Sequence, residues 1–224
     1  MVDPKRMPGP RPPLTTAAAC ELVQRLDARV AILVEGWSDQ AALETLAQRH
    51  RHDLRAQGIV VLPIGGVTNI AHFVQALGPS PGLDRALAGL FDAAEVEVVI
   101  RGLRRLQIGA ADLAPHNLES LGFYVCNPDL EGELIRAIGG VGVEQILKAE
   151  GELDSFRRFQ TQPAQRGRDH AAQLHRFLGT RAGRKIRYGS LLVEALELHK
   201  VPRVLDRVLA HALAGHRDKS QPLT

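Results

Sequence analysis

Short apolar runs alternate with stretches of helical periodicity through the first half of the chain. The runs are rich in Val, Ile and Leu, which is typical of strands buried on both faces of a parallel sheet. Because parallel strands need a crossover connection, this alternation predicts an α/β fold whose mostly parallel sheet has about four strands flanked by helices. The predicted strands are residues 30–34, 59–62, 86–91 and 121–126, and the predicted helices are residues 16–28, 38–48, 69–77 and 95–106.

The second half of the chain has a different pattern, because no strand is evident after Asp129. Helical segments follow one another almost to the end of the sequence. They predict a helical extension at residues 139–214, beside an α/β core at residues 15–138. The proline-rich residues 1–14 and the polar residues 215–224 are expected to be disordered tails.

Composition narrows the class of protein. Hydrophobic residues make up 45% of the 224 residues and aromatic residues only 4%, so the core is expected to consist of Leu, Val and Ala. No apolar run approaches the roughly 20 residues of a membrane span, and the N-terminus lacks the apolar stretch of a secretory signal. Two distant cysteines, Cys20 and Cys126, fit buried thiols in a reducing compartment. We therefore expect a cytoplasmic protein that has no membrane partner.

The charge of the chain is mildly basic, with a formal net charge of +3 at pH 7. This balance permits nucleic-acid binding but does not establish it. Basic residues gather between residues 157 and 187, where either a solvated helical face or a nucleic-acid surface explains them. Arg168, Arg184 and Arg187 are the members of this group that we predict to contact nucleic acid.

Acidic residues follow three of the four predicted strands. Because the carboxyl ends of parallel strands meet at one edge of a sheet, where ligands bind, we expect these acids to lie together. The second strand ends instead in Gly65-Gly66, which lets the backbone approach a ligand closely. In the first loop, Gly36 is expected to allow the turn and Ser38 to cap the following helix. The acids are Glu35 and Asp39 after the first strand, Asp92 and Glu95 after the third, and Asp129, Glu131 and Glu133 after the fourth.

Carboxylates that gather at one edge repel one another unless a cation lies between them. Hard divalent cations prefer oxygen ligands, so the pattern predicts Mg²⁺ or Mn²⁺ rather than zinc, whose His/Cys spacing is absent. The histidines are scattered, and His50, His52, His170 and His175 are predicted to be surface residues rather than ligands. The alternative is that acids at helix starts only complement the helix dipole.

Several motifs of other enzyme classes do not occur in the sequence. No G-x-x-x-x-G-K-[ST] motif is present, so no ATP site of that kind is expected in this chain. Neither a G-x-G-x-x-G motif after a strand nor an H-E-x-x-H motif occurs, which argues against a dinucleotide site and a zinc protease. A G-x-S-x-G nucleophile motif is also missing.

An ordered set of motifs resembles the TOPRIM domain of the OLD-family (overcoming lysogenization defect) endonucleases. TOPRIM domains are a catalytic fold shared by topoisomerases, bacterial primases and some nucleases. The resemblance spans about residues 29–200 and implies a TOPRIM-like, Rossmann-like sheet. The motifs are Val34-Glu35-Gly36 with Asp39, Leu62-Pro63-Ile64-Gly65-Gly66 with Asn69, Gly89-Leu90-Phe91-Asp92, Asp129-Leu130-Glu131, and the late Lys185.

The resemblance implies an endonuclease that hydrolyses phosphodiester bonds of DNA with two Mg²⁺ or Mn²⁺ ions. It makes Lys185 a catalytic residue that stabilises charge developing on the phosphate, which agrees with general phosphoryl-transfer chemistry. Glu35 would serve both catalysis and metal binding. The metal ligands that it implies, together with the nearby Glu95, are Glu35, Asp39, Asp92, Glu95, Asp129 and Glu131.

The sequence departs from the family pattern at two points. TOPRIM domains usually carry Asp-x-Asp in the second motif, whereas the second position here is Ala94, followed by Glu95. Either Glu95 reaches the same metal, or one metal site is weakened. OLD proteins also carry an N-terminal ATPase that dimerises, and the given sequence has none, so any ATP dependence would need a separate ATPase subunit.

These departures leave other functions open. One is a non-catalytic module that binds nucleic acid or a partner protein after losing a metal site. Another is nucleotidyl transfer, although template-binding and nucleotide-binding elements are not found. RNA stays open as a substrate because phosphate contacts do not report on the sugar, and a homodimer stays open as the assembly.

Overall fold

A computed structural model gives the structure of residues 12–109 and 113–218. It contains a four-stranded sheet in the order β2-β1-β3-β4, and every pair of neighbouring strands is parallel. The predicted parallel α/β sheet is therefore confirmed, with each strand close to its expected position. The strands are β1 (Val30–Val34), β2 (Ile59–Pro63), β3 (Ala86–Asp92) and β4 (Phe123–Cys126).

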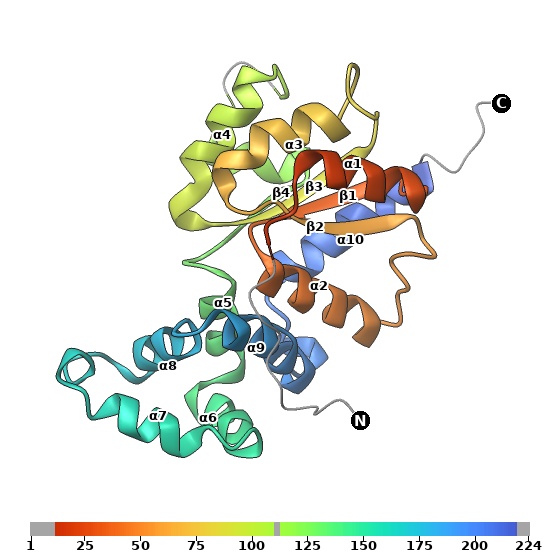
Figure 1. Cartoon of the computed structure of the whole chain (residues 1–224). Coiled ribbons are helices and arrows are strands. Elements are labelled where there is room, and N and C mark those ends of the chain that lie inside the picture. Colours follow the sequence, from red (N-terminus) through yellow and green to blue (C-terminus); the bar gives the residue numbers. More distant parts are fainter. Residues whose placement is uncertain (1–11, 110–112, 219–224) are drawn as a thin grey trace.

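The central strand β1 is buried along its whole length, which explains why its sequence is a continuous apolar run rather than an alternating one. Val30 and Ile32 belong to the core on one face of the sheet, together with side chains of α2 and α10. Ala31 and Leu33 belong to the core on the other face, with α1, α3 and α4. These helices are α1 (Thr16–Arg25), α2 (Trp37–Arg49), α3 (Ile70–Leu77), α4 (Val96–Arg105) and α10 (Arg203–Asp218) (Figure 1).

The strand order places a switch point between β1 and β3. The chain leaves β1 toward β2 on one side of the sheet and leaves β3 toward β4 on the other side. A crevice opens at the carboxyl ends of strands at such a point. Val34 pairs with Leu90 there, two residues before Asp92, so the acids that follow β1 and β3 start from neighbouring positions.

The second half of the chain forms a separate group of helices below the sheet, which we call the helical lobe (Figure 1). Its helix α9 packs against α2 and joins the lobe to the sheet domain. The lobe comprises α5 (Leu130–Ile138), α6 (Gly140–Ala149), α7 (Leu153–Gln160), α8 (His170–Leu178) and α9 (Ala182–Ala195). Short 3₁₀ helices η1 (Val67–Asn69), η2 (Ala93–Glu95), η3 (Pro115–Leu121), η4 (Pro163–Gln165) and η5 (Leu198–Lys200) connect the larger elements.

The last helix, α10, does not stay with the lobe but returns to pack against β1, β3 and β4. Its apolar side chains, among them Leu205, Val208 and Ala212, complete the core on the α2 face. The helix continues to Asp218, past the predicted start of the tail at residue 215. The outer parts of the two predicted tails, residues 1–11 and 219–224, lie outside the described residues.

Two smaller expectations can be compared with the structure. Cys126 is buried and Cys20 is partly buried, and both are free thiols. Within the described ranges, no helix is both long enough and apolar enough to cross a membrane.

Candidate functional site

A cavity of about 360 Å³ opens at the carboxyl edge of the sheet, and we call it the acidic cavity. Loops after three strands and the first turns of α9 line it, although they lie far apart in the sequence. The sequence-predicted residues that the structure brings together in its wall are Glu35, Gly36, Asp39, Gly65, Gly66, Asp92 and Lys185. Trp37, at the start of α2, also lines it.

Asp39 lies in the first turn of α2 and is only 8% exposed. Its Oδ2 accepts a hydrogen bond from the backbone N–H of Gly36 at 2.8 Å. The predicted cap was therefore wrong: Gly36, not Ser38, is the N-cap residue, because the Asp39 carboxylate reaches back to it. The other oxygen, Oδ1, has only a long contact of 3.4 Å from the Ser38 hydroxyl.

The backbone conformation requires glycine at Gly65 and Gly66 but not at Gly36. Gly36 has φ −143°, an extended conformation open to other residues, so the turn that it allows does not require a glycine. Gly65 and Gly66 have φ of +71° and +106°, which other residues rarely adopt. Their N–H groups both donate to the Glu35 backbone oxygen, which fixes the second loop against the first.

Asp92 and Glu95 extend the acidic group from the end of β3. Glu95 ends η2, and its carboxyl lies beside that of Glu35. The shift from the family's acidic position at Ala94 to Glu95 therefore still brings a carboxyl to the cluster. No hydrogen bond from the described residues reaches Glu95 Oε2, although this atom is buried. A buried carboxylate oxygen without a partner is costly unless a proton or cation satisfies it.

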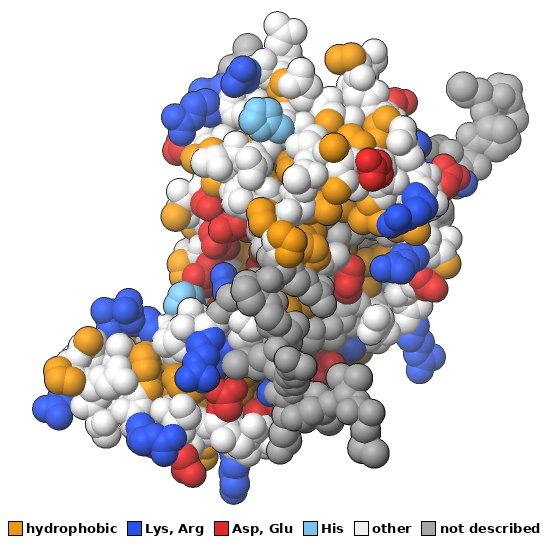
Figure 2. All heavy atoms as spheres, viewed as in Figure 1, with side chains coloured by type: hydrophobic (Ala, Val, Ile, Leu, Met, Phe, Trp, Pro, Cys, Tyr) orange, Lys and Arg blue, Asp and Glu red, His pale blue; other side chains and the backbone are white. Residues whose placement is uncertain are grey.

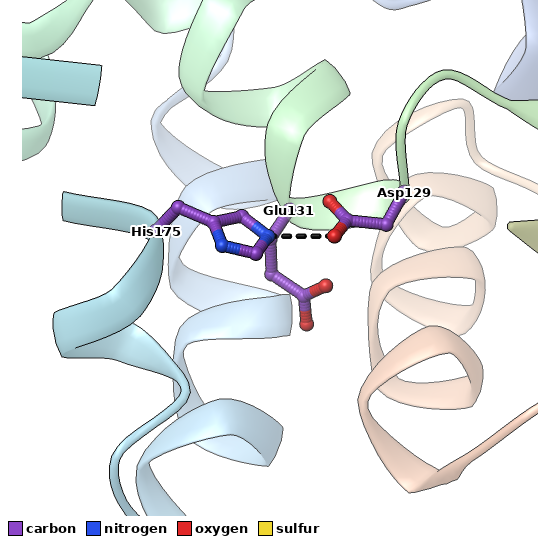
Figure 3. A group of neighbouring side chains, drawn as sticks. All are labelled: Asp129, Glu131 and His175. Atoms are coloured by element: carbon purple, nitrogen blue, oxygen red, sulfur yellow. Dashed lines mark hydrogen bonds and ion pairs between the residues drawn. The ribbon is translucent and has the colours of Figure 1, made fainter. Parts of the chain in front are cut away.

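Asp129, Glu131 and His175 form a second group of ligand atoms, all within 4.8 Å of one another. Figure 3 shows the Asp129 and His175 side chains pointing toward one another from the start of α5 and from α8, with Glu131 beside them. The His175 Nε2 to Asp129 Oδ2 distance is 2.6 Å, and the second Asp129 oxygen accepts from the Gly132 N–H. His175 was predicted to be a surface residue rather than a ligand; its side chain is 39% exposed, and the folded lobe also places it at the acids.

Glu133, the remaining acid after β4, turns away from this group. Its Oε1 accepts from the backbone N–H of Asn127, and its Oε2 pairs with Arg136 at 3.0 Å. It therefore stabilises the loop between β4 and α5 and leaves Asp129 and Glu131 as the acids that face the other ligands.

Lys185 supplies the positive charge of the site from α9. Its Nζ lies 3.3 Å from Glu131 Oε1. Helix α9 can come close to the start of α2 because Gly189, one turn after Lys185, packs on the backbone of Ser38. A Cβ at Gly189 would lie 2.6 Å from the Ser38 backbone oxygen.

The electrostatics indicate an excess of negative charge. Burial, followed by the Glu131 carboxylate, raises the pKa of Asp39 to about 7, although Lys185 opposes this shift. Burial and Glu35 raise the pKa of Asp92 to about 7, and the same two causes raise that of Glu95 to about 8. One lysine is therefore not enough to keep these carboxyls ionised at neutral pH.

Where an oppositely charged partner is present, the pKa shifts favour the charged form of the side chain. Burial opposes the charged form of Lys185, yet Glu131 and Asp39 raise its pKa to about 12. Burial would also raise the pKa of Asp129, but the His175 hydrogen bond and the Gly132 N–H lower it overall. The same hydrogen bond raises the pKa of His175.

The residues present fit a divalent cation. Carboxylate oxygens are the ligands that Mg²⁺ and Mn²⁺ prefer. The buried oxygen of Glu95 and the raised pKa values indicate sites where a cation would replace a proton. Among the described residues, Asp129, Glu131 and His175 bring their ligand atoms close enough together to hold an ion. Glu35, Asp39 and Asp92 line the acidic cavity but do not form such a group.

The predicted nucleic-acid residues fall into different environments. Arg184 was wrongly predicted to contact nucleic acid: its side chain is 4% exposed and pairs with Glu152 at 2.5 Å. Its guanidinium also lies 4.1 Å over the Phe177 ring, inside the lobe. Arg187 pairs with Glu150 and is largely covered. Arg168 is exposed, and its Nε donates to the Ala164 carbonyl.

Comparison with known proteins agrees with this geometry. Residues 27–92 match the model of the OLD-like TOPRIM domain, described as "Overcoming lysogenization defect protein-like, TOPRIM domain". No curated protein matches the chain.

Two solved structures share the fold over most of the chain. The C-terminal region of the Xanthomonas campestris pv. campestris OLD protein is 23% identical, with a TM-score of 0.68 over 88% of this chain and 97% of that one. The corresponding region from Burkholderia pseudomallei is 21% identical, with a TM-score of 0.64 over 84% and 98%. Residues 27–92 thus match an OLD-like TOPRIM domain, and the chain has the fold of the C-terminal region of OLD proteins.

Proposed function

We propose that the chain is a metal-dependent nuclease that hydrolyses phosphodiester bonds of DNA. The observation that carries this proposal is the convergence of carboxylates from separate strand ends with Lys185 around one cavity. Raised pKa values at Asp39, Asp92 and Glu95 support it, because the cluster lacks compensating positive charge. The resemblance to OLD-type TOPRIM domains agrees with this chemistry.

Each group of residues has a role in the proposal. Glu35, Asp39, Asp92 and Glu95 hold one Mg²⁺ or Mn²⁺ ion, and Asp129 and Glu131, with His175, hold the second. When bound, such ions activate water and stabilise charge on the attacking and leaving oxygens. Lys185, already held beside Glu131, adds a positive charge next to the phosphate in the transition state.

Plasmid cleavage tests this proposal directly. Supercoiled DNA is incubated with the chain in Mg²⁺ or Mn²⁺, alongside Glu35→Ala and Asp92→Ala. We expect the wild type to nick or linearise the plasmid, and each variant to lose at least about 100-fold in rate, as expected when transition-state charge stabilisation is removed. Equal cleavage by wild type and both variants would contradict the proposal.

Glu133→Ala is the matched control, because Glu133 is an acid in the first turn of α5 that contacts Asn127 and Arg136 instead of the ligands. It should retain cleavage within a few-fold. Cleavage of a linear DNA fragment and of an RNA with the same sequence, measured in parallel, determines whether the enzyme distinguishes deoxyribose from ribose.

The second candidate is a non-catalytic module that binds nucleic acid or a partner through a degenerate metal site. Ala94, which stands where an acid is usual, is the feature that favours it. Titration with Mn²⁺ in a calorimeter separates the two candidates. A nuclease site should bind two Mn²⁺ ions and lose one of them in Glu35→Ala, whereas a degenerate site should show no binding that depends on Glu35.

A further inference from the structure

A second cavity, of about 620 Å³, lies between α5 and α8 in the helical lobe, and we call it the basic groove. Arg136 lines it from α5, Arg168 from the loop before α8, and Arg176 from α8. All three residues are exposed. Apart from Arg168, the sequence patterns did not single out these residues as a site.

The groove has a net positive lining. Its one acid, Asp169, is the N-cap of α8 and already accepts a hydrogen bond from the Ala172 N–H at 2.7 Å. Arg136 pairs with Glu133 at its outer end, but its side chain stays 59% exposed. Arg168 and Arg176 therefore carry the charge that is available to an anion.

His175 connects the groove to the acidic group. It lines the groove, and its Nε2 lies 2.6 Å from Asp129 Oδ2. In Figure 2, acidic side chains gather between the α4 region above and the lobe below, and basic side chains lie on the lobe next to them. A phosphate bound in the groove would thus lie beside the proposed metal ligands.

The floor of the groove favours backbone contacts over base recognition. Its lining includes small residues such as Gly139 and Ala172, and the space beside the Gly139 Cα is open, which lets a sugar-phosphate chain approach closely. None of the described residues in its lining is Phe, Tyr or Trp, so it offers no aromatic platform for stacking bases.

We infer that the basic groove holds the phosphodiester backbone of a single nucleic-acid strand on one side of the bond to be cleaved, with Arg168 and Arg176 contacting its phosphates. The inference rests on the proposed function for the identity of the ligand. Contacts to phosphate position a strand without reading its sequence. Binding through the groove is therefore independent of sequence and falls as salt rises.

The test measures binding without cleavage. The full chain is titrated into a fluorescein-labelled 12-nucleotide single strand of mixed sequence in EDTA, and anisotropy is followed at several salt concentrations. We expect the Arg168→Ala/Arg176→Ala double variant to bind about tenfold more weakly. The slope of log K against log salt should fall in magnitude by about 1.4, because two phosphate contacts are removed.

Arg158→Ala/Arg166→Ala is the matched control. It removes the same charge from exposed arginines of the lobe, and Arg166 also donates its Nε to a backbone carbonyl, that of Thr161. Neither residue lines the groove. The control should change affinity less than twofold. Equal weakening by both double variants would overturn the inference, because net charge alone would then explain it.

A second variant tests the groove without removing an arginine. Ala171 is exposed on α8 and lines the groove, so Ala171→Glu adds a negative charge there and keeps good helix propensity. It should weaken binding about threefold or more, and unchanged binding would contradict the inference. Because the assay uses EDTA, a failed plasmid-cleavage experiment with normal groove binding would reject the proposed nuclease activity alone.

Discussion

The sheet edge and the helical lobe contribute to the same site in different ways. Glu35 and Asp92 lie at the ends of neighbouring parallel strands, so the ladder between β1 and β3 alone brings them together. Lys185 reaches the acidic cavity because α9 packs on α2, and His175 meets Asp129 because α8 packs on α5 within the lobe. The acids thus depend on local sequence and strand pairing, whereas the compensating cations depend on contacts between distant segments.

Extensive apolar packing of α9 on α2 and a few specific polar and close backbone contacts hold the lobe in place. Gly189 packs on the backbone of Ser38, and the Arg49 guanidinium donates to the carbonyls of Val193 and Leu196 at the end of α9. Inside the lobe, Arg184 is tied to Glu152 and Phe177. Changes at these positions should therefore disturb the lobe and leave the acids of the sheet edge in place.

The largest effect is expected from Arg184→Ala. Removing this buried guanidinium leaves Glu152, which is 17% exposed, without its partner, and breaking such a pair costs about 3–5 kcal/mol. Urea unfolding measures this loss. Arg181→Ala, an exposed neighbour, should stay within about 0.5 kcal/mol of wild type. A similar small effect of Arg184→Ala would contradict its structural role.

Gly189→Ala is expected to have the next largest effect, because the added methyl cannot fit against the Ser38 backbone without moving α9. Overpacking of this kind costs about 1–3 kcal/mol, and the shift of Lys185 should also slow plasmid cleavage. Gly215→Ala in α10 is the matched control, since its Cβ would make an ordinary contact of 3.6 Å with Ala86. The control should be neutral or slightly stabilising because alanine favours helix.

The pH dependence of stability isolates the acids of the sheet edge. The folded protein raises the pKa of Asp39 and Asp92 from 3.8 to about 7, and that of Glu95 from 4.5 to about 8. Between about pH 4 and 8 the folded state therefore binds more protons than the unfolded state, so stability must fall as pH rises. In EDTA, the urea midpoint should be lower at pH 8.5 than at pH 5.5.

Two additions sharpen this experiment. Mn²⁺ should raise the midpoint more at pH 8.5 than at pH 5.5, because binding to the folded state stabilises it and the cation competes with protons. The Asp39→Asn/Asp92→Asn variant removes two of the titrating groups and should flatten the pH dependence in EDTA. A urea midpoint that rises with pH in the wild type in EDTA would refute the excess of negative charge at the sheet edge.

The smallest effect is expected from His175→Ala. The pair with Asp129 is partly exposed, so solvent reduces its contribution to about 1 kcal/mol. The pKa of Asp129 is lowered and that of His175 is raised by folding, so the pair stabilises the protein above the unfolded pKa of the acid. This stability is lost again as pH rises through the folded pKa of the histidine. The destabilisation by His175→Ala should be larger at pH 5.5 than at pH 9.

Much of the sheet could be predicted from the sequence. The run Val30–Val34 is a strand over the same residues as predicted, since a continuous apolar segment of that length is buried on both faces of a parallel sheet. The helix Val96–Arg105 also formed where expected, despite its valines. Ser38 was a wrong cap because the cap depends on where the Asp39 carboxylate points, which a residue pattern does not specify.

By itself, the sequence determined the strands, their parallel order of connection and therefore the acids that meet at one edge. Those features follow from the hydrophobic pattern within each strand and from the short connection between one parallel strand and the next. Both involve only residues that are close in the sequence. Only the tertiary structure decided which arginines are buried, such as Arg184, which are exposed, such as Arg168, and that His175 meets Asp129. These outcomes depend on how helices distant in sequence pack on one another, and the short-range pattern around an arginine or histidine is the same in either environment.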